Sequence, residues 1–439
     1  ILWKSTRFNI RMFRPMESYQ KYGGVLTFAR SVGYAVVKKP EGYTTAKVDQ
    51  IIQENEKKSA NEQQSTAKQY PNIITVVNET FADIKVLGDF KTNEDYMPYF
   101  HSLKKNCVTG YTYASIVGGQ TANTEFELLT GNTLGFLSAG TTAFQLYIHG
   151  QMPSLVSNLK AEGYSGNKAM HPFNPYNYNR PAVYKDFGFA DFIDKFDFPK
   201  NVKRVREYIS DEANVDRIIS EYEKNRKKTD QPFYMYNMTI QNHSPYDKDA
   251  ANFKQPIKIE SSKYDAEANR YLNLIKYSDD SLKQLTSYFE KCKEPTIILF
   301  LGDHQPRLTD EFMNKITNGQ YQTWSSEQMM KRYQVPFVIW ANYDIKEQHI
   351  EKTSMNYIQS ILTKTAGVKM TGYQRFLNEV RKEVPTITSQ GYWGKNGKFY
   401  QINDKGSPYY GIIQKYRMIQ YNMMFDKKNR RDSFFEVSK

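Results

Sequence analysis

Four short runs of mostly apolar residues punctuate the chain, and each has the length of a β-strand. They span residues 71–79, 233–239, 296–302 and 335–341. Apolar residues on both faces of such a run indicate a strand buried within a parallel sheet. The first run ends at Glu79, the second leads into His243, and the third leads into Asp303 and His304.

Helical periodicity occupies the intervals between these runs. Residues 265–291 carry apolar or small side chains at 271, 274, 275, 278, 282, 285 and 289, one face of a 3.6-residue repeat. Residues 153–162 form a shorter predicted helix that ends at Gly163. Alternating strands and helices predict an α/β fold whose mostly parallel central sheet is sandwiched by helices. Because such sheets carry their sites at the strands' carboxyl ends, the polar residues at the run ends are expected to converge.

The two ends of the chain differ in residue composition and pattern from residues 71–367, which we expect to form the catalytic domain. Residues 368–439 contain short aromatic pieces, glycine turns and a helical stretch, and predict a small C-terminal α+β subdomain. Residues 1–70 are expected to be a juxtamembrane segment and a linker. The basic, aromatic residues 1–45 fit a membrane surface or a strap along the main domain, and residues 48–64 are polar and helical in character.

The charge of the chain favours anionic partners. Sixty Lys and Arg residues against 47 Asp and Glu residues give a formal net charge of +13, which suits lipid head groups or phosphate polymers, or simply a solubilising surface. Nucleic acid is disfavoured, because no zinc-finger spacing, ribonucleoprotein motif or basic recognition helix stands out. No apolar run is long enough to cross a bilayer, so we expect a soluble piece of a processed or longer protein. Cys107 and Cys292 have no metal-site spacing, and no disulfide can be assigned to them.

A glycine turn lies directly before a short helical run. Gly118, Gly119 and Gln120 precede Thr121, and residues 124–129 are helical in character. Backbone N–H groups and the positive end of the helix dipole at such a turn favour a phosphate. Thr121 is therefore either a helix N-cap or a nucleophile placed beside a phosphate.

The residues at the ends of the predicted strands favour the second alternative. Glu79, Asp303 and His304 form a set of oxygen and nitrogen donors suited to Mn²⁺ or Zn²⁺, and the Thr121 oxygen could complete it. A bound divalent cation lowers the pKa of a coordinated hydroxyl and offsets charge on a phosphoryl oxygen. Singly these residues are ordinary caps and loop residues, but together they predict a metal-dependent phosphoryl-transfer site.

Four segments also resemble the motifs of lipoteichoic acid synthase-like phosphoglycerol transferases, members of the alkaline phosphatase and sulfatase superfamily. They are residues 78–81, 119–126, 242–246 and 302–304, within a resemblance that covers residues 71–367. The resemblance implies one divalent metal held by Glu79, Thr121, Asp303 and His304, with Mn²⁺ favoured and Zn²⁺ left open as the alternative. It also implies that Thr121 takes glycerol phosphate from phosphatidylglycerol and passes it to a cell-surface glycopolymer, while His243 contacts the phosphoryl group or assists proton transfer.

A fifth segment, residues 171–180, is similar to the part of this family that forms the glycerol phosphate pocket. His171 and Arg180 match its histidine and arginine, whereas Tyr178 stands where a tryptophan is usual, which leaves head-group and acceptor specificity open. Such proteins carry N-terminal membrane helices. The resemblance therefore implies a monomeric extracellular domain at the membrane of a Gram-positive-type bacterium, beside an anionic membrane surface.

Other activities of the superfamily were weighed against this one. A phosphoethanolamine transferase would use the same threonine and metal. A sulfatase activity is disfavoured, because it needs Cys or Ser in a Cys/Ser-x-Pro-x-Arg setting and Thr121 is followed by Ala122, Asn123 and Thr124. A non-catalytic module that binds anionic glycopolymers is the alternative outside enzymes. The acceptor, whether lipoteichoic acid or a wall polysaccharide, stays open.

Overall fold

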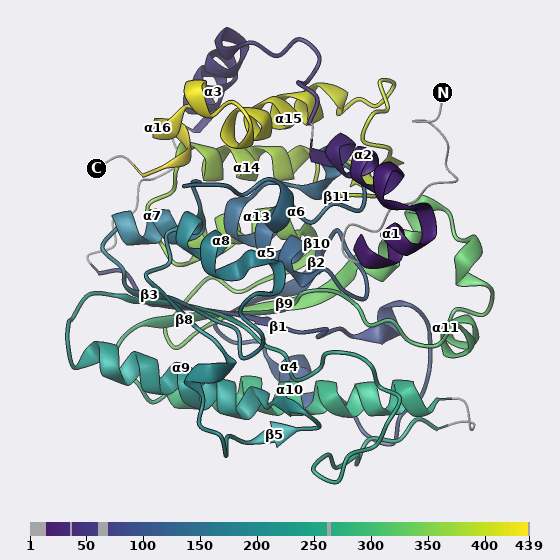
Figure 1. Ribbon diagram of the computed structural model, residues 1–439. Coiled ribbons are helices and arrows are strands. Elements are labelled where there is room, and N and C mark those ends of the chain that lie inside the picture. Colours follow the sequence, from purple (N-terminus) through teal and green to yellow (C-terminus); the bar gives the residue numbers. More distant parts are fainter. Residues whose placement is uncertain (1–14, 36, 60–68, 261–264, 438–439) are drawn as a thin grey trace.

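The computed structural model in Figure 1 describes residues 15–35, 37–59, 69–260 and 265–437. An eight-stranded sheet with the order β10-β2-β9-β8-β1-β7-β3-β4 forms its centre. The buried strands β1 (Asn72–Asn78), β7 (Phe233–Met238) and β8 (Thr296–Gly302) lie side by side and parallel. The three predicted strands that lead to candidate site residues are therefore confirmed, and they form the middle of the sheet.

The remaining strands complete the sheet on both sides. β9 (Gln334–Ala341), the fourth predicted strand, runs antiparallel to β8 and to β2 (Cys107–Tyr113), so the sheet is mostly rather than wholly parallel. β10 (Gln348–Ser354) follows β2, while β3 (Ser165–Met170) and β4 (Asp191–Ile193) continue beyond β7. The sequence analysis did not predict β2, β3, β4 or β10.

Helices cover both faces of the sheet, as predicted (Figure 1). On the lower face in this view lie α4 (Pro98–Ser102), α9 (Asp211–Arg226) and α10 (Ala266–Phe289), which is the helix expected at residues 265–291. On the upper face lie α5 (Thr121–Thr130), α7 (Leu155–Ala161), α8 (Arg180–Phe187) and α13 (Met355–Thr365). α7 begins after Ser154, whose side chain caps it, and matches the shorter predicted helix.

The C-terminal residues add a small antiparallel sheet and three helices to the upper layer. The sheet contains β11 (Thr386–Thr388), β12 (Gly391–Trp393) and β13 (Phe399–Tyr400), with the expected hairpin between the last two. The helices are α14 (Gly372–Glu383), α15 (Tyr410–Met424) and α16 (Asp432–Phe435). Their apolar side chains belong to the same hydrophobic core as α5 and α13.

The N-terminal residues form helices that lie against this layer. They are α1 (Pro15–Tyr22), α2 (Gly24–Ala35) and α3 (Thr45–Ser59). Ion pairs join α3 to the C-terminal segment, through Glu54 with Lys415 and Asp49 with Arg431. Residues 1–14 and the predicted linker at residues 60–68 lie outside the described residues. Within the described ranges, no helix is both long enough and apolar enough to cross a bilayer.

Candidate active site

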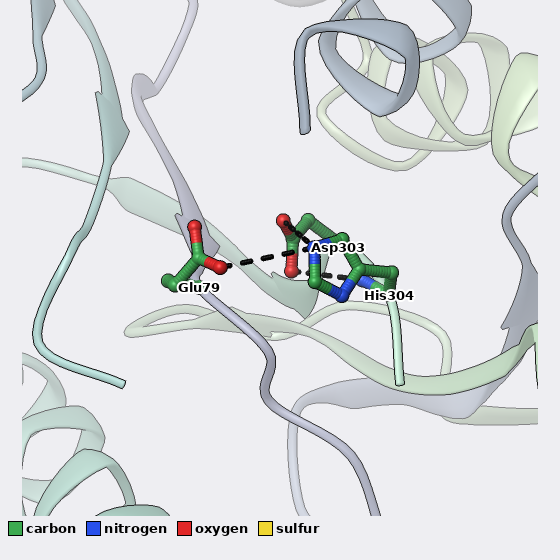
Figure 2. A group of neighbouring side chains, drawn as sticks. All are labelled: Glu79, Asp303 and His304. Atoms are coloured by element: carbon green, nitrogen blue, oxygen red, sulfur yellow. Dashed lines mark hydrogen bonds and ion pairs between the residues drawn. The ribbon is translucent and has the colours of Figure 1, made fainter. Parts of the chain in front are cut away.

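The predicted strand-end residues meet where β1 and β8 end. These strands pair in parallel up to Asn78 opposite Gly302, so Glu79 lies beside Asp303 and His304 (Figure 2). One potential ligand atom from each of the three side chains lies within 4.8 Å of the others. His304 Nε2 is 3.7 Å from Glu79 Oε1 and 3.2 Å from Asp303 Oδ2. The three side chains are almost fully buried.

Neighbouring groups orient these side chains but leave two buried acceptors unused. Asp303 Oδ1 accepts hydrogen bonds from the backbone N–H groups of Thr80 (2.6 Å) and His304 (2.8 Å), whereas Asp303 Oδ2 accepts no hydrogen bond. His304 Nδ1 donates to the carbonyl oxygen of Gln305 at 3.0 Å, so Nε2 keeps its lone pair and also has no partner. Buried acceptors without partners are costly. Their donor types and their closeness fit a divalent cation.

The charges of the cluster lead to the same assignment. Burial and the nearby Asp303 carboxylate raise the pKa of Glu79 to about 8. Burial beside a second carboxylate disfavours the charged form of the Glu79 side chain. A cation bound between them would offset this repulsion.

Thr121 reaches the same cluster from the start of α5. Gln120, in the left-handed region with φ 68°, occupies the N-cap position of this helix, although its side chain accepts no hydrogen bond from the first turn. Thr121 is therefore the first helical residue and not the N-cap. The Thr121 hydroxyl donates to Glu79 Oε2 at 3.4 Å, and the side chain is buried. Upstream, the Gly118 N–H donates to the Gln305 carbonyl at 3.0 Å, which ties the glycine turn to the segment that carries His304. The Thr121 hydroxyl therefore lies beside the candidate metal ligands at a helix N-terminus.

A cleft of about 500 Å³ opens above this cluster. Of the eight predicted site residues, only Asp303 does not line this cleft. The seven that do are Glu79, Thr121, His171, Tyr178, Arg180, His243 and His304. Two further lining residues not predicted from the sequence are the exposed Arg307 and Tyr176. The structure thus brings the predicted residues to one cavity.

Two of the three histidines that line the cleft, His171 and His243, are outside the cluster of candidate metal ligands, and each has one ring nitrogen fixed by a carbonyl oxygen. His171 Nδ1 donates to the Met238 carbonyl at 3.0 Å, and His243 Nδ1 donates to the Ser244 carbonyl at 2.7 Å. Burial, and then the Arg180 charge, hold the pKa of His171 well below its usual value. Burial also lowers the pKa of His243. In the neutral form each ring therefore keeps an Nε2 lone pair that can accept a proton or a hydrogen bond.

Arg180 is held by a buried carboxylate that sequence reasoning missed. Its Nε and Nη2 donate to Glu125 Oε1 at 3.1 and 2.7 Å, while Tyr184 and Tyr236 donate their hydroxyls to Glu125 Oε2 at 2.5 and 3.2 Å. The Arg180 guanidinium also lies 5.1 Å from the centre of the Tyr178 ring. Glu125 follows Thr121 by one helical turn, and this i, i+4 spacing was the available signal.

Arg206 fixes the backbone of the segment that carries His243 through hydrogen bonds. The sequence analysis did not identify this residue. Its Nη2 donates to the carbonyl oxygens of Gln241 (2.8 Å) and His243 (2.7 Å), and its Nη1 donates to that of Pro245 (2.7 Å). Arg206 lies between the two-residue strands β5 (Arg204–Val205) and β6 (Tyr208–Ile209). Nothing in the local sequence signals this role.

The sulfatase family profile matches residues 71–368 of the chain. The chain therefore belongs to the sulfatase family, within the alkaline phosphatase superfamily. The matched range agrees with residues 71–367, over which the sequence motifs resemble this superfamily.

Three named bacterial proteins are similar to this chain in sequence. A Rhizobium meliloti protein named for cyclic β-1,2-glucan modification is 30% identical over 433 residues, which cover 97% of this chain and 65% of that protein. The lipoteichoic acid synthase-like protein YvgJ of Bacillus subtilis is 27% identical over 53% of this chain and 36% of its own length. The lipoteichoic acid synthase of Staphylococcus aureus is 28% identical over 42% of this chain and 28% of its own length. The chain spans two thirds of the first relative at most, and about a third of the others.

Two solved structures share the fold. The phosphoglycerol transferase GacH of Streptococcus pyogenes, solved with sn-glycerol-1-phosphate, superposes with a TM-score of 0.73 at 20% identity over 92% of this chain and 100% of that chain. The lipoteichoic acid synthase LtaP of Listeria monocytogenes gives a TM-score of 0.63 at 19% identity over 89% of this chain and 99% of its own. These likenesses establish the architecture around the cleft.

Proposed function

We propose that this domain is a metal-dependent transferase that moves glycerol phosphate from phosphatidylglycerol to a hydroxyl group of a cell-surface glycopolymer. The observation that carries the proposal is the position of Thr121, whose hydroxyl lies at a helix N-terminus beside the unpartnered acceptors of Asp303 and His304. Related proteins named as phosphoglycerol transferases and lipoteichoic acid synthases support the choice of transferred group.

In the first step Thr121 acts as the nucleophile. Its oxygen forms a bond to phosphorus while the bond between phosphorus and the diacylglycerol oxygen breaks. The threonine proton moves toward Glu79, its hydrogen-bond partner, and the leaving diacylglycerol takes up one proton. A divalent cation held by Glu79, Asp303 and His304 together with Thr121, Mn²⁺ in preference to Zn²⁺, would supply charge neutralisation at the phosphoryl oxygens and a lower pKa for the hydroxyl.

In the second step the acceptor hydroxyl attacks the phosphoryl-threonine. Its oxygen bonds to phosphorus, the phosphorus–threonine bond breaks, and Thr121 regains a proton. His243, neutral with a free Nε2 lone pair, is placed to accept the acceptor's proton. Arg180 offers a second N–H of Nη1 to a phosphoryl oxygen, because Nε and Nη2 donate to Glu125 and Nη1 makes only one long hydrogen bond, of 3.5 Å, to the Asn177 carbonyl oxygen. His171, as a neutral acceptor, suits a glycerol hydroxyl, and Tyr178 forms the wall beside Arg180.

The acceptor and the location belong to the same proposal. The basic chain would face an anionic membrane from the extracellular side as a monomer, with the rest of a membrane protein preceding it. Its relatives come from Bacillus and Staphylococcus and also from Rhizobium meliloti, so the envelope type stays a prediction. The name of the Rhizobium meliloti relative favours a glucan as acceptor over lipoteichoic acid.

Release of diacylglycerol from phosphatidylglycerol tests the proposal. We expect release by the purified domain with Mn²⁺, loss of release after chelation, and at least a thousandfold loss in Thr121→Ala. Gln401→Ala, a substitution of an exposed neutral side chain just after β13, serves as the folded control. Release from phosphatidylethanolamine instead would identify a phosphoethanolamine transferase. Release from neither lipid would leave the non-catalytic glycopolymer-binding module.

A further inference from the structure

A second hollow, of about 480 Å³, lies beside the catalytic cleft, and the two share Phe173. Its walls are mostly aromatic and proline side chains together with three cations. We call it the aromatic groove; its residues include Phe173, Phe196, Phe198, Lys195, Lys200 and Arg204. The proposed chemistry assigns no role to this surface.

Within the described part of the chain, two of the three exposed Phe, Tyr or Trp rings lie at these two hollows. Phe196 in the aromatic groove is 72% exposed, and Tyr176 at the cleft is 79% exposed. Of the described residues, the only other large hydrophobic side chains classed as exposed are Tyr19 and Val25. Exposed apolar rings that cluster around a cavity mark a binding surface, whereas scattered ones need no explanation.

The turn that presents Phe196 is rigid. Asp194 caps the short 3₁₀ helix η5 (Lys195–Asp197) by accepting from the Phe196 N–H at 2.7 Å, and the Asp197 carboxylate accepts from the Asp194 N–H at 2.8 Å. Both carboxylates therefore face backbone donors of the turn. A preorganised ring loses little entropy when a ligand stacks on it.

The charge of the groove selects an anionic ligand. Lys195 Nζ lies 4.9 Å from the centre of the Phe196 ring, and Lys200 is exposed. Arg204 adds a third cation, against the single carboxylate of Glu207 in the lining. Flat apolar rings beside cations suit sugar rings that carry phosphate groups.

We propose that the aromatic groove binds the acceptor, a polysaccharide whose sugar rings stack on Phe196 and Phe173 and whose phosphate substituents meet the three cations. This inference rests on the proposed function. Phe173 joins the groove to the chemistry, because its ring stacks on His243 with centroids 6.2 Å apart. His243 is the residue proposed to deprotonate the acceptor hydroxyl. A chain lying in the groove would thus enter the cleft at the group that activates it.

Two readouts on one variant test this assignment. In Phe196→Ala we expect diacylglycerol release to stay within twofold of wild type. Transfer of labelled glycerol phosphate to cyclic β-1,2-glucan that already carries some phosphoglycerol groups should fall at least tenfold in kcat/KM, through a higher KM for the glucan. Gln401→Ala, at an exposed position outside both hollows, should change neither reaction.

The remaining outcomes overturn the assignment. Unchanged transfer in Phe196→Ala would remove the groove from acceptor binding. Equal loss of both reactions, with reduced binding to phosphatidylglycerol vesicles, would make the groove a membrane contact.

A binding experiment separates this inference from the proposed function, because it needs no turnover. In it, phosphoglycerol-substituted glucan is titrated into the Thr121→Ala protein. Binding that is lost on adding Phe196→Ala supports the groove even if no lipid is cleaved, and binding that survives rejects it.

Discussion

The Thr121 hydroxyl is available for chemistry because another residue, Gln120, occupies the N-cap position of α5. The same helix carries Glu125 one turn after Thr121, the proposed nucleophile. One helix therefore carries both Thr121 and the carboxylate that holds Arg180.

Replacing Glu125 by Gln should impair catalysis without touching the candidate metal ligands. The change removes the charge that holds Arg180, and breaking a buried ion pair costs about 3–5 kcal/mol. We expect kcat/KM for diacylglycerol release to fall at least tenfold, with a lower melting temperature and unchanged metal affinity. Tyr236→Phe, which removes only the 3.2 Å hydrogen bond to the same carboxylate, is the matched control. A fall in metal affinity equal to the fall in activity would contradict this role.

Glu127 gives a prediction about stability and pH. Burial raises its pKa to about 7 from 4.5, and Oε2 has no partner although Oε1 accepts from Ser115 and the Leu134 N–H. Because the folded-state pKa is raised, this residue's contribution to stability is full below pH 4.5 and is lost as the pH rises through 7. The loss amounts to about 3 kcal/mol.

Glu127→Gln should remove that pH dependence. The free energy of unfolding, measured in urea at pH 4.5 and pH 8, should fall less with pH in the variant by about 3 kcal/mol. An equal fall in both proteins would show that Glu127 does not titrate in this range.

At the residue scale, sequence patterns identified the groups that follow buried strands and missed those that act through long-range contacts. Glu79, Asp303 and His304 were predictable because an apolar strand ends beside each of them. Arg206 was not predictable, because its partners lie 35 to 39 residues away along the chain. The i, i+4 spacing from Thr121 places Glu125 near the site, but its partner Arg180, 55 residues away, could not be assigned from that spacing.

At the scale of elements, the site depends on how closely β1 and β8 end together. Gly302 is the last residue of β8, and a Cβ there would lie 1.8 Å from the Phe81 carbonyl oxygen. Only glycine permits this approach, which brings Asp303 beside Thr80 and Glu79.

Gly302→Ala should therefore separate the two strand ends. The clash is with backbone, so we expect lower stability by several kcal/mol and loss of metal binding, measured by thermal unfolding and calorimetric titration with Mn²⁺. Gly319→Ala, where a Cβ meets nothing within 4 Å, should leave both unchanged. Normal Mn²⁺ affinity in folded Gly302→Ala protein would refute the need for this close approach.

The strands themselves were predictable to different degrees for a physical reason. β1, β7 and β8 are covered on both faces and read as continuous apolar runs. β3 and β10 lie toward the edges of the sheet and carry polar residues, so no apolar run marks them.

At the scale of the whole molecule, we propose that residues 71–367 form the catalytic domain, residues 368–439 its small C-terminal subdomain, and residues 1–70 the membrane-proximal segment and linker. The subdomain supports the far end of α5. Tyr373 and Tyr416 donate their hydroxyls to the Gly131 carbonyl at 2.8 and 2.6 Å, just beyond the last residue of the helix that Thr121 begins.

Metal binding should stabilise the entire fold, because the ligands join two strand ends of the central sheet. A cation that binds only the folded state adds about 2.7 kcal/mol at a hundredfold excess over Kd. Mn²⁺ should therefore raise the melting temperature, chelation should reverse the rise, and Asp303→Asn should abolish it. A rise of the same size in Asp303→Asn would place the bound ion elsewhere.

The intact mass of the domain after incubation with phosphatidylglycerol and Mn²⁺ tests the central claim most directly. We predict a phosphoglyceryl adduct on the wild-type protein that is absent from Thr121→Ala and is discharged when an acceptor glucan is added. Diacylglycerol release measured in the same sample accounts for an adduct that hydrolyses rapidly. An adduct of equal yield on Thr121→Ala, or neither adduct nor diacylglycerol from the wild type, would contradict the account.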